Sequence, residues 1–176
     1  MILLWIITAV VVVLGFAAFF GAPYVPSHAS QVRRAFTDLR PLTDKDVVVD
    51  LGSGDGVVLR HAIEYGAGRA IGYEINPLLV WLSRGLSLKY RDRITIQTAN
   101  MWHGHPPDGV SVVYVFGVGR DMKRLVALIE RWANQSGREI ECLVYGHELP
   151  DVTPVRQVGA HRLYRFTALH RPKAQV

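Results

Sequence analysis

The sequence predicts an α/β fold with a mostly parallel β-sheet, preceded by an N-terminal transmembrane helix. Apolar strand patterns alternate with helical patterns from residue 46 to residue 145. A glycine-rich turn directly follows the first strand, and the first 20 residues carry no charge. Alternation of strands and helices is typical of a parallel sheet covered on both faces. Ligands of such sheets bind beyond the carboxyl ends of the strands.

The composition limits the class of protein. The chain has 176 residues, enough for one domain with a sizeable core. Its net charge of +5 comes from scattered basic residues, which argues against a nucleic-acid-binding tail and favours an anionic lipid surface. A single cysteine, Cys142, excludes a disulfide framework and fits a reducing compartment.

Residues 1–20 are predicted to form a transmembrane anchor. Twenty helical residues span roughly 30 Å, the thickness of the hydrocarbon layer. The alternative is a cleaved signal peptide, but no basic residue precedes the apolar run, which is also long for such a peptide. Arg33, Arg34 and Arg40 follow the run, so the positive-inside rule places the N-terminus outside and the C-terminal domain in the cytoplasm. The membrane would be a bacterial inner membrane or, with the domain in the matrix, a mitochondrial one.

Residues 21–45 are expected to form a connector and a helix ahead of the first strand. Pro23 and Pro26 stop the anchor helix, and Ser27 or Ser30 caps a helix that runs to about Leu39. Residues 46–170 then form the main domain, and 171–176 a tail. Within that domain, strands are expected at 46–51, 70–74, 94–98, 110–116 and 140–145, helices at 57–65, 77–90 and 120–134, and a hairpin at 155–158 and 163–169.

The helix at 77–90 has a clear start signal. Asn76 is expected as its N-cap and Pro77 as its first residue. Leu79, Leu82 and Leu86 recur at helical spacing and are expected to face the core.

The glycine turn identifies the type of ligand. A dinucleotide-binding G-x-G-x-x-G pattern requires glycine at position 57, which is Val57, so that match and an oxidoreductase function are disfavoured. Asp50-x-Gly52-x-Gly54-x-Gly56 instead resembles motif I of class I S-adenosyl-L-methionine (SAM) methyltransferases. In that family the turn approaches the methionine part of SAM, which here implies contacts from Asp50 and from the five turn residues Gly52, Ser53, Gly54, Asp55 and Gly56. A purely structural turn is the alternative.

Polar residues end the next two strands. Glu74 lies twenty residues after Gly54, where a carboxylate can accept both ribose hydroxyls, although alone it could be a solvated acid. Asn100 stands where the methyltransferase family often has Asp, and its carbonyl can accept from the adenine amino group. Met101 and Trp102 offer an apolar wall for the adenine ring, and Asn76 is also expected beside the cofactor.

Several longer segments narrow the resemblance. Residues 23–26, 72–84, 100–102 and 115–118 are similar to a family of small membrane-anchored protein-lysine methyltransferases, whose mitochondrial members modify the ATP synthase c-subunit and the adenine nucleotide translocase. The resemblance implies a Rossmann-like seven-stranded sheet with a final antiparallel hairpin. Asn100 replaces the family's Asp, Leu78 its common Trp, and residues 146–150 a more aromatic segment, which affects the choice of substrate.

The function predicted from these observations is SAM-dependent methylation of a lysine in a membrane protein. Desolvation near the sulfonium charge would neutralise the lysine, so no catalytic base is assigned. Tyr24, Trp102 and Phe116 are expected to line the amine channel, unless they serve core packing or membrane anchoring.

Other substrates and partners are weighed on the same sequence. Residues 115–118 lack the Asn/Asp-Pro-Pro-Tyr/Phe pattern of enzymes that methylate nucleobases or glutamine. The expected partners are therefore the bilayer and a protein, with no nucleic acid and no metal; His103 and His105 are interpreted as loop residues. A lipid or quinone methyltransferase and a non-catalytic membrane scaffold remain alternatives.

Overall fold

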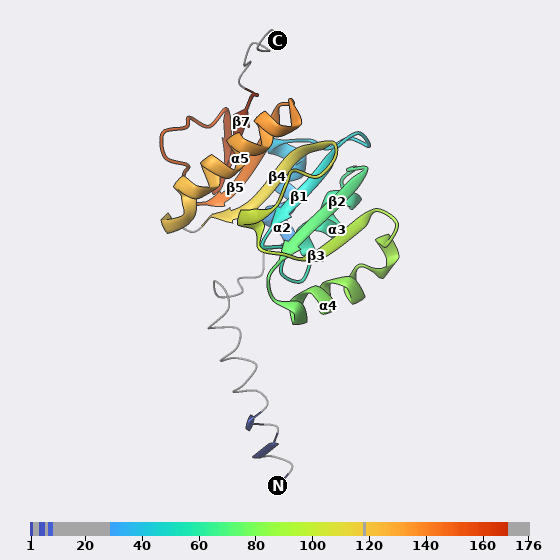
Figure 1. Cartoon of the computed structure of the whole chain (residues 1–176). Coiled ribbons are helices and arrows are strands. Elements are labelled where there is room, and N and C mark those ends of the chain that lie inside the picture. The colour runs from blue at the N-terminus through green and yellow to red at the C-terminus, as the bar shows by residue number, and fades with distance from the viewer. Residues whose placement is uncertain (2–3, 6, 9–28, 118, 169–176) are drawn as a thin grey trace, which may run out of the picture.

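A seven-stranded sheet organises the chain, in the order β3-β2-β1-β4-β5-β7-β6 (Figure 1). The computed structural model describes residues 1, 4–5, 7–8, 29–117 and 119–168. Its strands are β1 (Val47–Leu51), β2 (Arg69–Glu74), β3 (Ile94–Thr98), β4 (Val110–Gly117), β5 (Ile140–Gly146), β6 (Arg156–Val158) and β7 (His161–Phe166). The first five strands pair in parallel, and β6 and β7 form the antiparallel hairpin, which confirms the predicted sheet.

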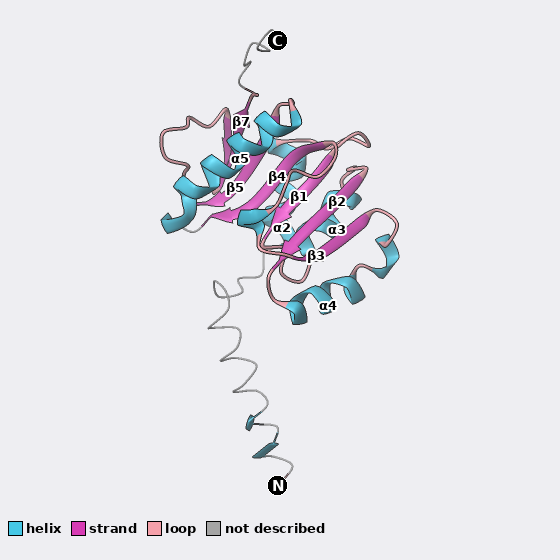
Figure 2. Cartoon of the chain, in the orientation of Figure 1, coloured by secondary structure: helices cyan, strands magenta, loops and turns pink. Residues whose placement is uncertain are grey.

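Helices cover both faces of the sheet (Figure 2). The helical elements are α2 (Ala29–Arg34), η1 (Ala35–Leu39), α3 (Val57–Glu64), α4 (Pro77–Leu86), η2 (Leu88–Tyr90), η3 (Met101–His103), η4 (Gly119–Asp121) and α5 (Met122–Ser136). On one face, α5 packs Leu125, Ile129 and Trp132 against the sheet. On the other face, α2, η1, α3 and α4 form a second apolar cluster with the sheet. The strands are therefore buried on both sides, as their apolar sequences predict.

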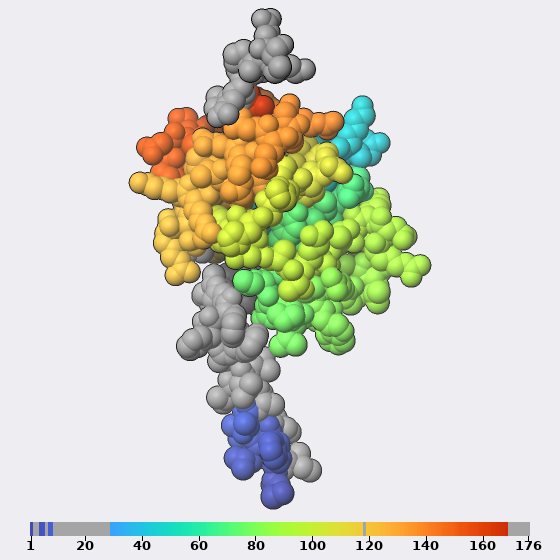
Figure 3. Space-filling view, viewed as in Figure 1, coloured from blue at the N-terminus to red at the C-terminus, as the bar shows by residue number. Residues whose placement is uncertain are grey.

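The orientation of α4 corrects the prediction that its leucines face the core. Leu82 and Leu86 are 42% and 51% exposed, and Leu79 is half-buried. The buried side of α4 carries Val80 and Ser83 instead. Ser83 faces inward where α4 packs closely against Gly56 of the glycine turn. Figure 3 shows α4, in green, at the surface of the domain.

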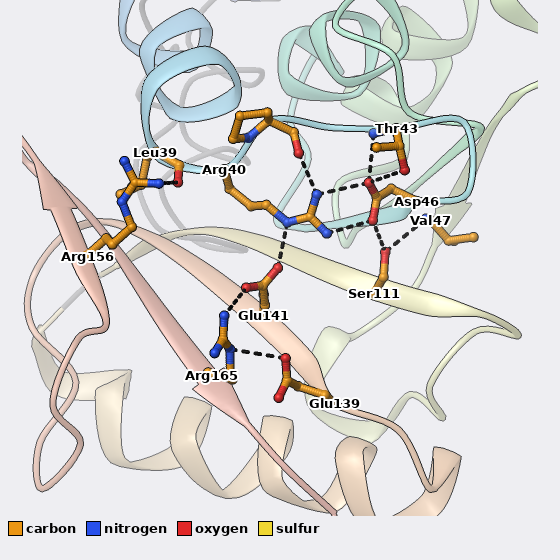
Figure 4. Close-up of polar contacts among 11 residues, drawn as sticks. Leu39, Arg40, Thr43, Asp46, Val47, Ser111, Glu139, Glu141, Arg156 and Arg165 are labelled. Carbon is orange, nitrogen blue, oxygen red and sulfur yellow. Dashed lines mark hydrogen bonds and ion pairs between the residues drawn. The ribbon is translucent and has the colours of Figure 1, made fainter.

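A polar network joins η1 to the amino ends of three strands (Figure 4). Arg40 follows η1, and its guanidinium donates to both carboxylate oxygens of Asp46, at 3.0 and 2.8 Å, and to Glu141 at 2.5 Å. Ser111 of β4 donates to Asp46 at 2.8 Å, and Arg165 of β7 contacts Glu141 at 3.1 Å.

The predicted localisation needs correction. Among the described residues, no helix is long and apolar enough to cross a membrane, so the structure does not support a single-pass membrane protein with a cytoplasmic domain. That prediction depended on the length and uncharged composition of residues 1–20 and on the basic residues that follow them. Most of residues 1–20, and the connector up to residue 28, lie outside the described residues.

Candidate functional site

The glycine turn after β1 has a backbone that only glycine adopts readily. Gly52, Gly54 and Gly56 have φ angles of 84°, 53° and 78°, in the left-handed region. The N–H groups of Gly52 and Ser53 both donate to the carbonyl of Tyr73, at 2.8 and 3.0 Å. The turn is therefore fixed to the end of β2.

Two of these glycines have different surroundings. A Cβ on Gly56 would collide with the Ser83 hydroxyl of α4, so this glycine allows α4 to pack against the turn. A Cβ on Gly52 would meet no atom within 4 Å. The turn therefore leaves open space beside Gly52, where a ligand can approach the backbone.

Glu74 connects the turn to the start of α4. One carboxylate oxygen accepts the N–H of Gly54 at 2.9 Å, and the other accepts the N–H of Asn76 at 2.8 Å. The residue is buried, at 8% exposure. Each carboxylate oxygen has a second lone pair, so Glu74 holds the turn and can still accept a ligand hydroxyl.

Asp50 is a buried carboxylic acid at the end of β1. Burial raises its pKa to about 8, and the nearby negative charges of Glu74 and Asp55 add to this effect. Asp55 lies within 3.5 Å of Arg60 of α3, which offsets part of its charge. A cationic ligand group near Asp50 would favour the ionised form of this acid.

Two asparagines shape the neighbouring loops in the same way. The side-chain oxygen of Asn76 accepts the N–H of Leu78 at 3.0 Å, which confirms the predicted N-cap of α4. The side-chain oxygen of Asn100 accepts the N–H of Trp102 at 3.1 Å. The Asn100 oxygen therefore starts the turn η3 and keeps one lone pair for a ligand.

Met101 and Trp102 are half-buried beside this turn. The guanidinium of Arg124 in α5 stacks 4.5 Å from the centre of the Trp102 ring, and Arg131 donates to the Trp102 carbonyl at 3.2 Å. These contacts hold Trp102, one of the two residues predicted to form an apolar wall, against α5.

Aromatic residues gather where β4 and β5 end. Phe116 is 38% exposed, and its ring lies 5.6 Å from that of Tyr145. Behind Tyr145, at 4.6 Å, is the buried His161, which shares a 2.9 Å hydrogen bond with Tyr114. Burial and the charge of Arg34 lower the pKa of His161 to about 4, so it is neutral at pH 7. Tyr24, predicted to lie near Phe116, is outside the described residues.

Tyr145 and His147 are residues of this edge that the sequence motifs do not mark. Only their position in the sequence could have indicated them, because both lie at the carboxyl end of a strand that is apolar and buried. The order of the sheet also divides the edge into two halves. Asp50 and the glycine turn lie at the end of β1, Glu74 ends β2, and Asn100 follows β3. Phe116 and Tyr145 lie near the ends of β4 and β5, on the other side of β1.

The architecture is that of a Rossmann-like class I methyltransferase. A solved RNA methyltransferase from Salinibacter ruber, in complex with S-adenosyl-L-homocysteine, superposes with a TM-score of 0.72 at 22% identity, covering 86% of this chain and 98% of that chain. This likeness shows the shared fold.

The family is narrower than the fold. Residues 50–156 match the model of the ANTKMT methyltransferase domain, and the chain belongs to this family, which confirms the resemblance predicted from the sequence. The ATP synthase c-subunit lysine N-methyltransferase of Xenopus laevis is 35% identical over 124 residues, covering 68% of this chain and 52% of that protein. The adenine nucleotide translocase lysine N-methyltransferase of Mus musculus is 47% identical over 62 residues, covering 35% of this chain and 26% of that protein. The chain thus spans about half the length of the first of these relatives.

Proposed function

We propose that the protein is a SAM-dependent protein-lysine N-methyltransferase. The observation that carries this proposal is the open, left-handed backbone at Gly52 beside the buried acid Asp50, in a chain of the ANTKMT methyltransferase family. The names of its relatives support lysine in a protein as the methyl acceptor. Residues 46–170 are proposed as the methyltransferase domain.

The residues of the β1–β3 half suit each part of SAM. Asp50 would meet the ammonium group, and the backbone of residues 52–56 the carboxylate. Glu74 would accept the ribose hydroxyls, and Asn100 the adenine amino group, with the ring against Met101 and Trp102. Asn76 would act indirectly, because its side chain caps α4 and its N–H holds Glu74.

The chain's own contribution to the reaction is alignment and exclusion of water. When bound, SAM supplies an electrophilic methyl group on a sulfonium. With the adenosine part over β2 and β3, the reactive end would point toward β4, where Phe116 lies exposed. Aromatic side chains there would desolvate the lysine amine and hold it in line with the methyl group. Phe116 remains the proposed wall of the amine channel.

The direct test is product analysis. The full-length protein is incubated with methyl-labelled SAM and a lysate of cells that lack its gene, and the lysate is then separated into protein and lipid fractions. Label recovered as methyl-lysine after hydrolysis of the protein supports the proposal. Label in the lipid or small-molecule fraction alone contradicts it and favours a lipid or quinone acceptor.

Glu74→Gln tests the proposed cofactor site. Glu74 accepts from two backbone N–H groups, and glutamine would turn an NH₂ group toward one of them. We expect the SAM dissociation constant, measured by isothermal titration calorimetry, to rise roughly 10–100-fold, because the neutral amide is a weaker acceptor for the ribose hydroxyls than the carboxylate and has one acceptor oxygen instead of two. Glu64→Gln, on the outer side of α3, is the control and should bind SAM like the wild type. Equal affinity of both variants would remove Glu74 from the site.

A further inference from the structure

His147 has one ring nitrogen engaged by the backbone. It follows the last residue of β5, and its Nδ1 lies 3.0 Å from the carbonyl oxygen of Gly117 at the end of β4. A carbonyl only accepts hydrogen bonds, so Nδ1 must carry the proton. In the neutral ring Nε2 is then a bare acceptor, which is the tautomer that a general base requires.

The ring lies at the half of the carboxyl edge that β4 and β5 form. Gly117 and Gly146 form the last pair of the β4–β5 ladder, and His147 extends just beyond it. A Cβ on Gly119 would lie 3.1 Å from Cδ2 and 3.2 Å from Nε2 of His147, so Gly119 packs closely against this side of the ring and a side chain there would crowd Nε2. The pair before Gly117–Gly146 in the ladder is Phe116–Tyr145, whose rings are in contact.

We propose that His147 is the general base that deprotonates the substrate lysine. This inference rests on the proposed function. A lysine is an ammonium ion at neutral pH and has no lone pair for attack until it loses a proton. His147 Nε2 takes that proton, the N–H electron pair stays on the lysine nitrogen, and the neutral amine accepts the methyl group. The imidazolium then returns its proton to water, since His147 is exposed.

The charged groups on the neighbouring elements already have partners. Arg120 and Asp121 of η4 lie 3.4 Å apart. Glu148 lies 2.7 Å from Arg162 of β7. On β4 the group that faces the ring is the Gly117 carbonyl. Among the described residues, none of these groups forms an ion pair with His147.

The alternative role for His147 is structural, because its hydrogen bond joins the ends of β4 and β5. His147→Asn separates the two roles. The asparagine amide can still donate to Gly117, but it has no basic nitrogen. His61→Asn is the matched control, because His61 lies on α3 and contacts Glu64 at the surface.

The pH dependence of methyl-lysine formation is the first measurement. Rates are taken from pH 6 to pH 10 with labelled SAM at saturation, so that titration of Asp50 does not limit cofactor binding. We expect the rate of methyl-lysine formation by the His147→Asn variant to be roughly 10²–10⁴-fold lower than that of the wild type at pH 7. The loss should shrink as the pH approaches the ordinary lysine pKa of about 10.4, where the substrate deprotonates unaided. A loss that is equal at every pH indicates a structural role and overturns the proposal, as does an unchanged rate at pH 7.

The second measurement does not depend on turnover. Full-length protein labelled with ¹⁵N-histidine is saturated with S-adenosyl-L-homocysteine and titrated with n-butylamine, a mimic of the lysine side chain. We expect the Nε2 resonance of His147 to shift and the resonances of His61 to stay fixed. The assignment is overturned if Nε2 carries the proton in the neutral ring, or if its resonance does not shift when n-butylamine is added.

The two proposals fail in different ways. If the wild type neither binds SAM nor forms methyl-lysine, the proposed function itself is wrong. If the wild type does both and His147→Asn has an unchanged pH profile with unchanged SAM affinity, only the role of His147 is wrong.

Discussion

At the scale of single residues, Asp50 combines a cost to stability with a use in binding. Its pKa of about 8, against an ordinary 3.8, means that the folded protein keeps a proton on this acid at neutral pH. A cofactor ammonium would favour the ionised acid, so we expect SAM binding at pH 7 to release a proton. The binding enthalpy should then depend on the ionisation enthalpy of the buffer.

Asp50→Asn is expected to stabilise the free protein at alkaline pH. Between pH 4 and pH 8 the folded state holds a proton that the unfolded state has lost, so stability falls as the pH rises through this window. Asparagine does not titrate. The Tm of the Asp50→Asn variant, measured by calorimetry without SAM, should exceed that of the wild type by roughly 5 °C at pH 8 and by much less at pH 4. SAM binding should weaken in the same variant. A Tm difference that does not change with pH would mean that Asp50 titrates normally.

At the scale of elements, the glycine turn and α4 form one unit. Gly56 has no room for a side chain because Ser83 of α4 lies against it. Glu74 accepts hydrogen bonds both from Gly54 in the turn and from Asn76, the N-cap of α4. A change in the turn should therefore displace α4, and with it the edge where the cofactor is proposed to bind.

Gly56→Ala should be strongly destabilising, by about 2 kcal/mol or more, because it adds a collision with Ser83 to the strain of a positive φ. Gly85→Ala is the matched control. Gly85 lies within α4, and no atom lies within 4 Å of an added Cβ, so alanine at this position should stabilise the protein by up to about 1 kcal/mol. Urea unfolding measures both. Similar effects at the two positions would contradict the tight packing of α4 on the turn.

Local patterns predicted the strands, the turn and the N-cap of α4, because each depends on neighbouring residues in the sequence. The rotation of α4 did not follow from them. Its sequence has two stripes at helical spacing, and the leucine stripe is the more apolar, yet contact with Gly56 selects the stripe of Val80 and Ser83. The position of His147 depends on the pairing of β4 with β5, which no local pattern encodes.

At the scale of the whole molecule, the two edges of the sheet have different roles. The amino edge holds the network of Arg40, Asp46 and Glu141, which joins η1 to the sheet. Burial raises the pKa of Asp46, but hydrogen bonds from Arg40, Ser111 and Thr43 outweigh it and keep the pKa below its ordinary value. The carboxyl edge holds the proposed site, far from this network along the strands.

Arg40→Gln should lower the free energy of unfolding by roughly 2–4 kcal/mol at pH 7, because the buried carboxylate of Asp46 loses its cation and Glu141 keeps only Arg165. The contribution of Asp46 exists above its ordinary pKa and disappears as the pH falls through its lower folded value. The difference in free energy of unfolding between the wild type and the Arg40→Gln variant should therefore become smaller in strong acid. Arg91→Gln, at a position 78% exposed, is the control and should be neutral. A matching loss at Arg91 would show that net charge, rather than the network, sets stability.

The exposed side of α4 also provides an optical probe. Trp81 is 77% exposed, whereas Trp132 is completely buried in the core. Indole emission shifts to longer wavelength in water, so the two residues should separate in the spectrum and in their access to iodide. With Trp5 and the half-buried Trp102 replaced by phenylalanine, quenching of Trp81 would follow α4 through unfolding, while Trp132 reports the core.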